Sequence, residues 1–117
     1  MIATIHKGLT FEKWNGQPME KRILNIASEL TRAKSLLAEN RMDLFKQSLE
    51  RALELMDLTT DSWKGERSFS WLKEFLRFRE MVASFYVEPQ EASPEMTTFI
   101  HAFLDLEPAC HNLGLEV

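Results

Sequence analysis

Among the charged residues of this sequence, Arg79 is unusual because apolar side chains surround it on its predicted helix. At about 100° per residue, a helical projection places Arg79 in the middle of the apolar arc of segment 68–87. A guanidinium group keeps its charge in a protein, so its burial requires a partner of opposite charge. Glu29 and Asp57 border the apolar faces of two other predicted helices. We therefore expect an internal ion pair between Arg79 and one of them; an arginine held in a cleft for an anionic ligand is the alternative.

Histidine and cysteine are the other residue types here that could do chemistry. The histidines are His6, His101 and His111, and the one cysteine is Cys110. Cys110 and His111 are adjacent, so they lack the three- or four-residue spacing that lets two side chains on one helix reach the same metal ion. The sequence also lacks a phosphate-binding loop, a GxGxxG motif, a nucleophile elbow and an HExxH motif. We predict no catalytic residue, no metal site and no cofactor.

Three aromatic residues, Trp71, Phe78 and Phe85, recur every seven positions at the edge of the apolar arc of segment 68–87. Heptad spacing is the pattern that a second helix recognises, so these residues are candidates for an interaction surface with a protein partner or a second copy of the chain. Aromatic residues on helices also commonly form the core. A third possibility is that the N-terminal segment, with Leu9, Phe11 and Trp14, covers this edge within one chain.

The composition limits the classes of protein. The 117 residues carry 14 Lys and Arg against 18 Asp and Glu, a net charge of −4, with 44% hydrophobic residues. This size and apolar content suit one globular domain. A negative charge argues against binding to nucleic acid or to anionic membranes, because both need a local excess of basic residues. No signal peptide and no run of about 18 apolar residues is visible, so we expect a cytoplasmic protein.

Four segments have the apolar spacing of amphipathic helices. We predict helices over about 18–38, 42–60, 68–87 and 94–106, separated by polar or proline-containing connectors. Short connectors favour antiparallel neighbours, so the predicted fold is an all-α, up-and-down antiparallel bundle of four main helices. Residues 1–17 form an irregular leader that packs on the bundle domain, residues 18–107. We expect residues 108–117 to be a loosely held C-terminal tail with an exposed Cys110.

The sequence resembles an uncharacterised family of small bacterial all-helical proteins. The resemblance covers Ile26 to Tyr86, and its most distinctive stretches read ALELMDLT at positions 52–59 and RFRE at positions 77–80. No activity is assigned to that family, so the resemblance implies a helical, cytoplasmic bacterial protein and no particular chemistry.

Two functional hypotheses follow from these observations. The first is a non-catalytic helical module that binds another protein or associates with itself through the third predicted helix. The alternative is a helical bundle that binds a small ligand, or acts on one, in a cleft near Arg79. The first hypothesis requires an apolar surface that the bundle leaves uncovered, whereas the second requires titratable groups that converge in a pocket.

Overall fold

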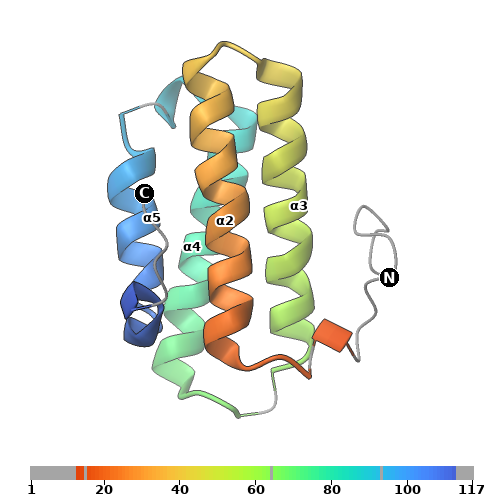
Figure 1. Cartoon of the computed structure of the whole chain (residues 1–117). Helices are drawn as coiled ribbons and strands as arrows, with labels where there is room; N and C mark the ends of the chain where they lie inside the picture. The colour runs from red at the N-terminus through yellow and green to blue at the C-terminus, as the bar shows by residue number, and fades with distance from the viewer. Residues whose placement is uncertain (1–12, 15, 64, 93, 113–117) are drawn as a thin grey trace.

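The protein folds as an all-α bundle, as the periodicity predicted (Figure 1). A computed structural model describes residues 13–14, 16–63, 65–92 and 94–112. Four helices pack against one another: α2 (Met19–Ala38), α3 (Met42–Asp61), α4 (Phe69–Val87) and α5 (Met96–Leu104). Two short 3₁₀ helices follow α4 and α5, namely η1 (Pro89–Glu91) and η2 (Pro108–Asn112). The described residues contain no strand.

The helices form a four-sided arrangement around one core. In Figure 1, α2 lies in front, α3 and α5 flank it, and α4 lies behind. Helix α2 packs on both α3 and α5, and α3 also packs on α4. The remaining side of the square, between α4 and α5, is filled by aromatic rings. The bundle is therefore closed on all four sides by its own helices.

Local chemistry explains two of the helix boundaries. Asn40 ends the turn after α2 with a φ of 59°, a left-handed conformation that asparagine tolerates better than most residues. The next amide, that of Arg41, donates to the carbonyl oxygen of Leu36 at 2.9 Å. At the start of α4, the Ser68 hydroxyl accepts a hydrogen bond from the Trp71 amide at 3.1 Å, which satisfies an amide that has no partner within the helix.

The core runs through all four helices and includes residues from both ends of the described chain. Its largest fully buried apolar side chains are Trp14, Ile23, Ile26, Leu30, Phe45, Leu49, Met56, Phe75, Met96, Ile100 and Phe103. Trp14 lies before α2, where its indole nitrogen donates to the Thr59 hydroxyl at 2.9 Å. The other predictions for the leader concern residues 1–12, which lie outside the described residues.

The predicted loose tail is wrong for its first residues. Residues 108–112 form η2, which packs on α2. Cys110 is completely buried there, not exposed, and its thiol lies 3.2 Å from the carbonyl oxygen of Glu20. The apolar character of a thiol explains this position, because free cysteine behaves as a small hydrophobic residue.

Candidate functional site

The ion pair of Arg79 forms with Asp57, at the junction of α3 and α4. Arg79 Nε donates to Asp57 Oδ1 at 3.0 Å, and Nη2 donates to Oδ2 at 3.3 Å. This hydrogen bond to Asp57 is the main reason that the pKa of Arg79 is raised above its ordinary value. The predicted burial is wrong, because the side chains of Arg79 and Asp57 are 32% and 47% exposed. Both ends of the guanidinium fork are thus directed to one carboxylate at the partly exposed junction of α3 and α4.

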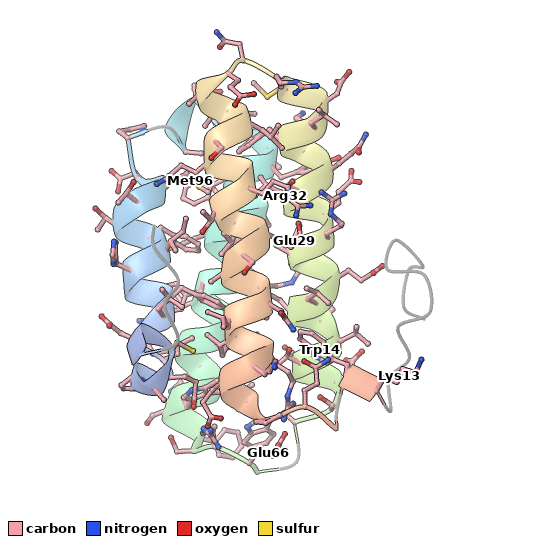
Figure 2. All side chains as sticks on the ribbon, in the orientation of Figure 1. Lys13, Trp14, Glu29, Arg32, Glu66 and Met96 are labelled. Atoms are coloured by element: carbon pink, nitrogen blue, oxygen red, sulfur yellow. The ribbon has the colours of Figure 1, made fainter. Side chains whose placement is uncertain are left out.

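Glu29 forms its ion pairs with other arginines. Its Oε1 atom accepts a hydrogen bond from Arg51 Nε of α3 at 3.2 Å and lies 3.9 Å from Arg32 Nη1 on its own helix. Figure 2 shows Glu29 and Arg32 on α2, on the side toward α3. The structure therefore does not bring Glu29 to Arg79, because α2 and α4 lie at opposite corners of the bundle.

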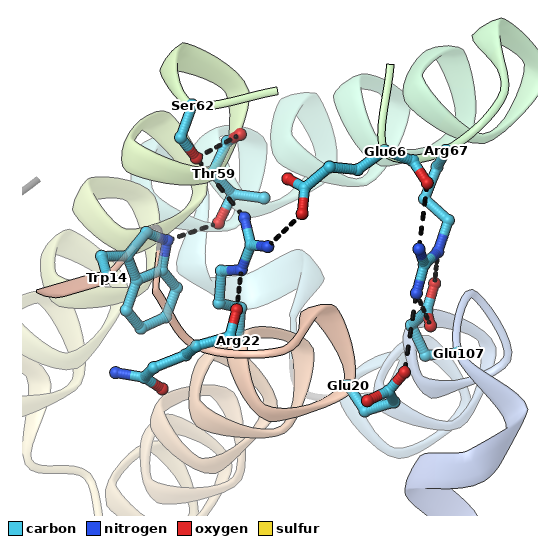
Figure 3. A network of polar contacts seen from close by, with 9 residues as sticks. Trp14, Glu20, Arg22, Thr59, Ser62, Glu66, Arg67 and Glu107 are labelled. Carbon is cyan, nitrogen blue, oxygen red and sulfur yellow. Dashed lines mark hydrogen bonds and ion pairs between the residues drawn. The ribbon is translucent and has the colours of Figure 1, made fainter. Parts of the chain in front are cut away.

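The buried arginine of this protein is Arg22, at the end of the bundle where α2 begins (Figure 3). Its side chain is only 1% exposed, and Nη2 donates to Glu66 Oε2 at 2.7 Å. Nε donates to the Gln17 carbonyl oxygen at 3.0 Å, and Nη1 to the Ser62 hydroxyl at 3.4 Å. The guanidinium thus has the charged partner and additional acceptors that burial demands.

A second arginine at the same end, Arg67, connects three segments of the chain. Arg67 Nη2 donates to Glu107 Oε1 at 2.7 Å and lies 3.6 Å from Glu20 Oε1 (Figure 3). The hydrogen bond to Glu107 is the largest cause of the raised pKa of Arg67. The indole nitrogen of Trp71 also donates to Glu107, at 3.0 Å. These contacts join the α3–α4 loop to the start of α2 and to the chain after α5.

We call this group the polar end cluster: Trp14, Glu20, Arg22, Thr59, Ser62, Glu66, Arg67 and Glu107. Sequence reasoning missed it because its members come from separate connectors and helix ends, where periodicity gives no information. One signal was present, since Arg22 lies between Met19 and Ile26 beside the apolar face of its helix. The paired charges indicate a structural role, holding the connectors to the bundle.

The prediction that Trp71, Phe78 and Phe85 form an interaction surface is wrong for the two phenylalanines, because α5 covers them, and the alternative that they belong to the core is confirmed. The Trp71 indole nitrogen instead donates to the carbonyl oxygen of Leu106, after α5. The Phe78 ring packs edge-on against Phe99 and Phe103, with ring centroids 5.5 and 5.6 Å apart. Phe85 is buried and meets Phe99 at 5.3 Å, while Trp71 stacks on its core neighbour within α4. These rings form the α4–α5 side of the core.

The apolar surface that the bundle leaves uncovered lies on the opposite, outer side of α4. Phe69 is 72% exposed, Leu76 38% and Val87 74%. At about 100° per residue, these three residues lie within about 20° of one line along the helix. We call them the outer stripe of α4. These residues belong to the wide apolar arc of the predicted helix. Because that arc is so wide, a helical projection cannot tell which of its two edges another helix covers and which stays exposed.

Cys110 is unsuited to act as a nucleophile. Burial, together with the nearby Glu107 and Glu20 carboxylates, raises the pKa of its thiol to about 11. The reactive thiolate is therefore scarce near neutral pH. Within the described part of the chain, no group of three His, Cys, Asp or Glu residues is placed to hold a metal ion. His101 is exposed on α5, and the side chains of His6 and His111 lie outside the described set.

The comparisons with known proteins identify no relative of this chain. No protein family model matches the sequence, and neither the curated proteins nor the solved structures include a match. The resemblance to a small bacterial family therefore stays a prediction. Among the helices that the structure describes, none combines the length and the apolar character needed to cross a membrane.

Proposed function

We propose that this protein is a non-catalytic helical module that associates with itself through the outer stripe of α4. The observation that carries the proposal is the exposure of Phe69, Leu76 and Val87 along one line of one helix. Exposed apolar residues that line up in this way mark association surfaces, because burying them removes apolar area from water.

The location of the stripe supports the same proposal. The inner edge of α4 is already covered by α5 through Phe78 and Phe85. Its flank toward α3 is occupied by the contacts of Arg79 with Asp57 and of Tyr86 with Glu50. The outer stripe is an apolar side of the helix that none of these contacts occupies, and a straight helical face can accept a second helix.

The charged groups of the protein fit a structural role better than a catalytic one. Three arginines each have a nitrogen atom within 3.0 Å of a carboxylate oxygen, namely Arg22, Arg67 and Arg79. A catalytic or ligand-binding arginine would need donors that point toward a vacant space. Arg79 instead directs two donors to Asp57, which weakens the alternative of a ligand cleft beside it.

We also propose a bacterial, cytoplasmic origin, on the family resemblance of residues 26–86. A buried free thiol at Cys110 is consistent with a reducing compartment.

Sedimentation equilibrium of the full chain, over a range of concentrations, tests the proposal. The chain has a mass of 13.7 kDa, and we expect the average mass to rise toward twice this value. Leu76→Gln should shift the rise to concentrations about tenfold higher, because one interface leucine is lost from each copy. A wild-type chain that keeps the monomer mass up to about 1 mM would overturn the proposal. A dimer Kd above that concentration corresponds to a binding free energy weaker than about 4 kcal/mol.

Met81→Gln is the matched control. Met81 lies on the same helix as Leu76 with nearly the same exposure, 39% against 38%. At about 100° per residue it points about 140° away from Leu76. Association that falls equally in both variants would mean that the outer stripe is not the interface.

A further inference from the structure

We infer that the partner is a second copy whose α4 runs antiparallel to the first, across a two-fold axis that passes beside Leu76. This inference rests on the proposed self-association. It is carried by two charged residues that flank Leu76, Lys73 on the N-terminal side and Glu80 on the C-terminal side. Both residues are exposed.

Lys73 and Glu80 lie on the same edge of the outer stripe. At about 100° per residue, Lys73 is about 40° and Glu80 about 20° from the line through Phe69, in the same direction. Neither residue forms an ion pair with any other residue in the described part of the chain. The stripe is thus bordered by one positive and one negative charge, about equally far from Leu76. Glu80 also lies near enough to Arg79 to raise the pKa of that arginine, but Arg79 forms its ion pair with Asp57.

A two-fold axis that reverses the helix direction brings these charges together. Such an axis exchanges positions before and after Leu76 but keeps each residue on the same edge of the interface. Lys73 of one copy then lies opposite Glu80 of the partner subunit, and the symmetry repeats the contact, as an isologous interface requires. In a parallel pair of helices, the two-fold axis would instead put Lys73 and Glu80 of the two copies on opposite edges of the interface, so neither charge would meet one of opposite sign.

The same axis also matches the sizes of the apolar side chains. Phe69 lies seven residues before Leu76 and Ala83 seven residues after it, which is about 10.5 Å in each direction at the rise of an α-helix. The axis therefore sets the exposed ring of Phe69 opposite the small, half-buried Ala83 of the partner subunit. The two Leu76 side chains meet at the centre. Large residues opposite small ones allow two helices to approach closely.

Charge reversal in the full chain tests the orientation. We expect Lys73→Glu and Glu80→Lys each to raise the dimer Kd about tenfold, because each variant creates two like-charge contacts. The double variant should return to within about threefold of the wild-type Kd, since both contacts become attractive again. Lys21→Glu, an exposed position on α2, gives the same change of net charge as Lys73→Glu and should leave the Kd unchanged.

Oxidative cross-linking provides a second measurement. Leu76→Cys should give a disulfide-linked dimer, because the two copies of this position meet at the axis. Val87→Cys should not, because eleven residues at about 1.5 Å per residue place its two copies about 33 Å apart. A parallel dimer would cross-link at both positions and would not respond to charge reversal, and this result would overturn the antiparallel arrangement while self-association stands. A chain that remains monomeric would overturn both proposals.

Discussion

Arg22 and Glu66 join two parts of the chain that are 44 residues apart, through a hydrogen bond of 2.7 Å between Nη2 and Oε2. The first residue belongs to the opening turns of α2 and the second to the loop between α3 and α4. Arg22 is buried, whereas Glu66 is 36% exposed. Loss of Glu66 therefore leaves a buried charge without its partner, whereas loss of Arg22 leaves a charge that water can reach.

Removing Glu66 should be more damaging than removing Arg22. Glu66→Gln leaves a buried guanidinium without a carboxylate, and we expect the free energy of unfolding to fall by about 2 kcal/mol or more. Arg22→Met removes the buried charge and leaves a carboxylate that water can reach, so we expect a loss of about 1 kcal/mol. Urea denaturation followed by circular dichroism measures both values.

The exposed pair of Arg77 with Glu74 is the control for this comparison. Its nitrogen and oxygen atoms are also 2.7 Å apart, but both side chains are largely exposed. Arg77→Met should therefore change the free energy of unfolding by about 0.5 kcal/mol or less. Equal losses for Glu66→Gln and Arg77→Met would contradict a structural role of the Arg22–Glu66 pair.

Arg79→Met should be mild, although Arg79 also holds a carboxylate. The pair with Asp57 is partly exposed, so both charges are screened by water and we expect a loss of about 1 kcal/mol or less. Thermal unfolding of the variant beside Glu66→Gln gives the ranking directly. A loss of about 3 kcal/mol would instead indicate that Asp57 and Arg79 become buried together in solution.

Phe85→Asp should unfold the protein and not merely dissociate an oligomer. The ring is buried against Phe99 of α5, so the substitution places an unpaired carboxylate in the core. Phe85→Ala should lower the free energy of unfolding by about 3 to 5 kcal/mol through the cavity that it leaves. Far-ultraviolet circular dichroism and urea denaturation check the two variants, and a folded aspartate variant would show that α5 does not cover this edge.

The stability of the protein should fall at high pH in a way that depends on Cys110. Burial raises the pKa of the thiol from 9.0 to about 11, so the folded state binds the proton more tightly than the unfolded state. This contribution is complete below about pH 9 and is lost as the pH rises toward about 11. Cys110→Ala removes the titrating group, so its unfolding free energy should decline less over this range.

The same Cys110 thiol should react slowly with a disulfide reagent at pH 8 in the folded protein and rapidly in denaturant. Equal rates in both conditions would contradict the burial of η2 against α2.

The sequence alone determined the helices of this protein. Apolar residues recur at three- and four-residue intervals in each of the four segments, and these intervals reflect a local geometry that each helix keeps in any packing. Breaks such as Asn40 are also local, because they depend on the backbone preference of one residue. The predicted segments 18–38, 42–60 and 68–87 consequently agree with α2, α3 and α4 to within a residue or so at each end.

Only the tertiary structure decided which side of each helix is covered. The apolar arc of α4 contains Phe85 at one edge and Phe69 at the other, and their chemical types do not distinguish them. The position of α5 buries Phe85 and leaves Phe69 exposed. Sequence reasoning therefore chose the wrong edge of α4 as the open surface.

The tertiary structure also decided which arginine is buried. Arg79 lies in the middle of an apolar arc, yet it remains partly exposed because α3 and α4 meet at that position through polar side chains. Arg22 lies beside its apolar face and is buried because the loop with Glu66 and the segment with Trp14 close over it. Burial depends on segments that are distant in the sequence, and helical periodicity contains no information about them.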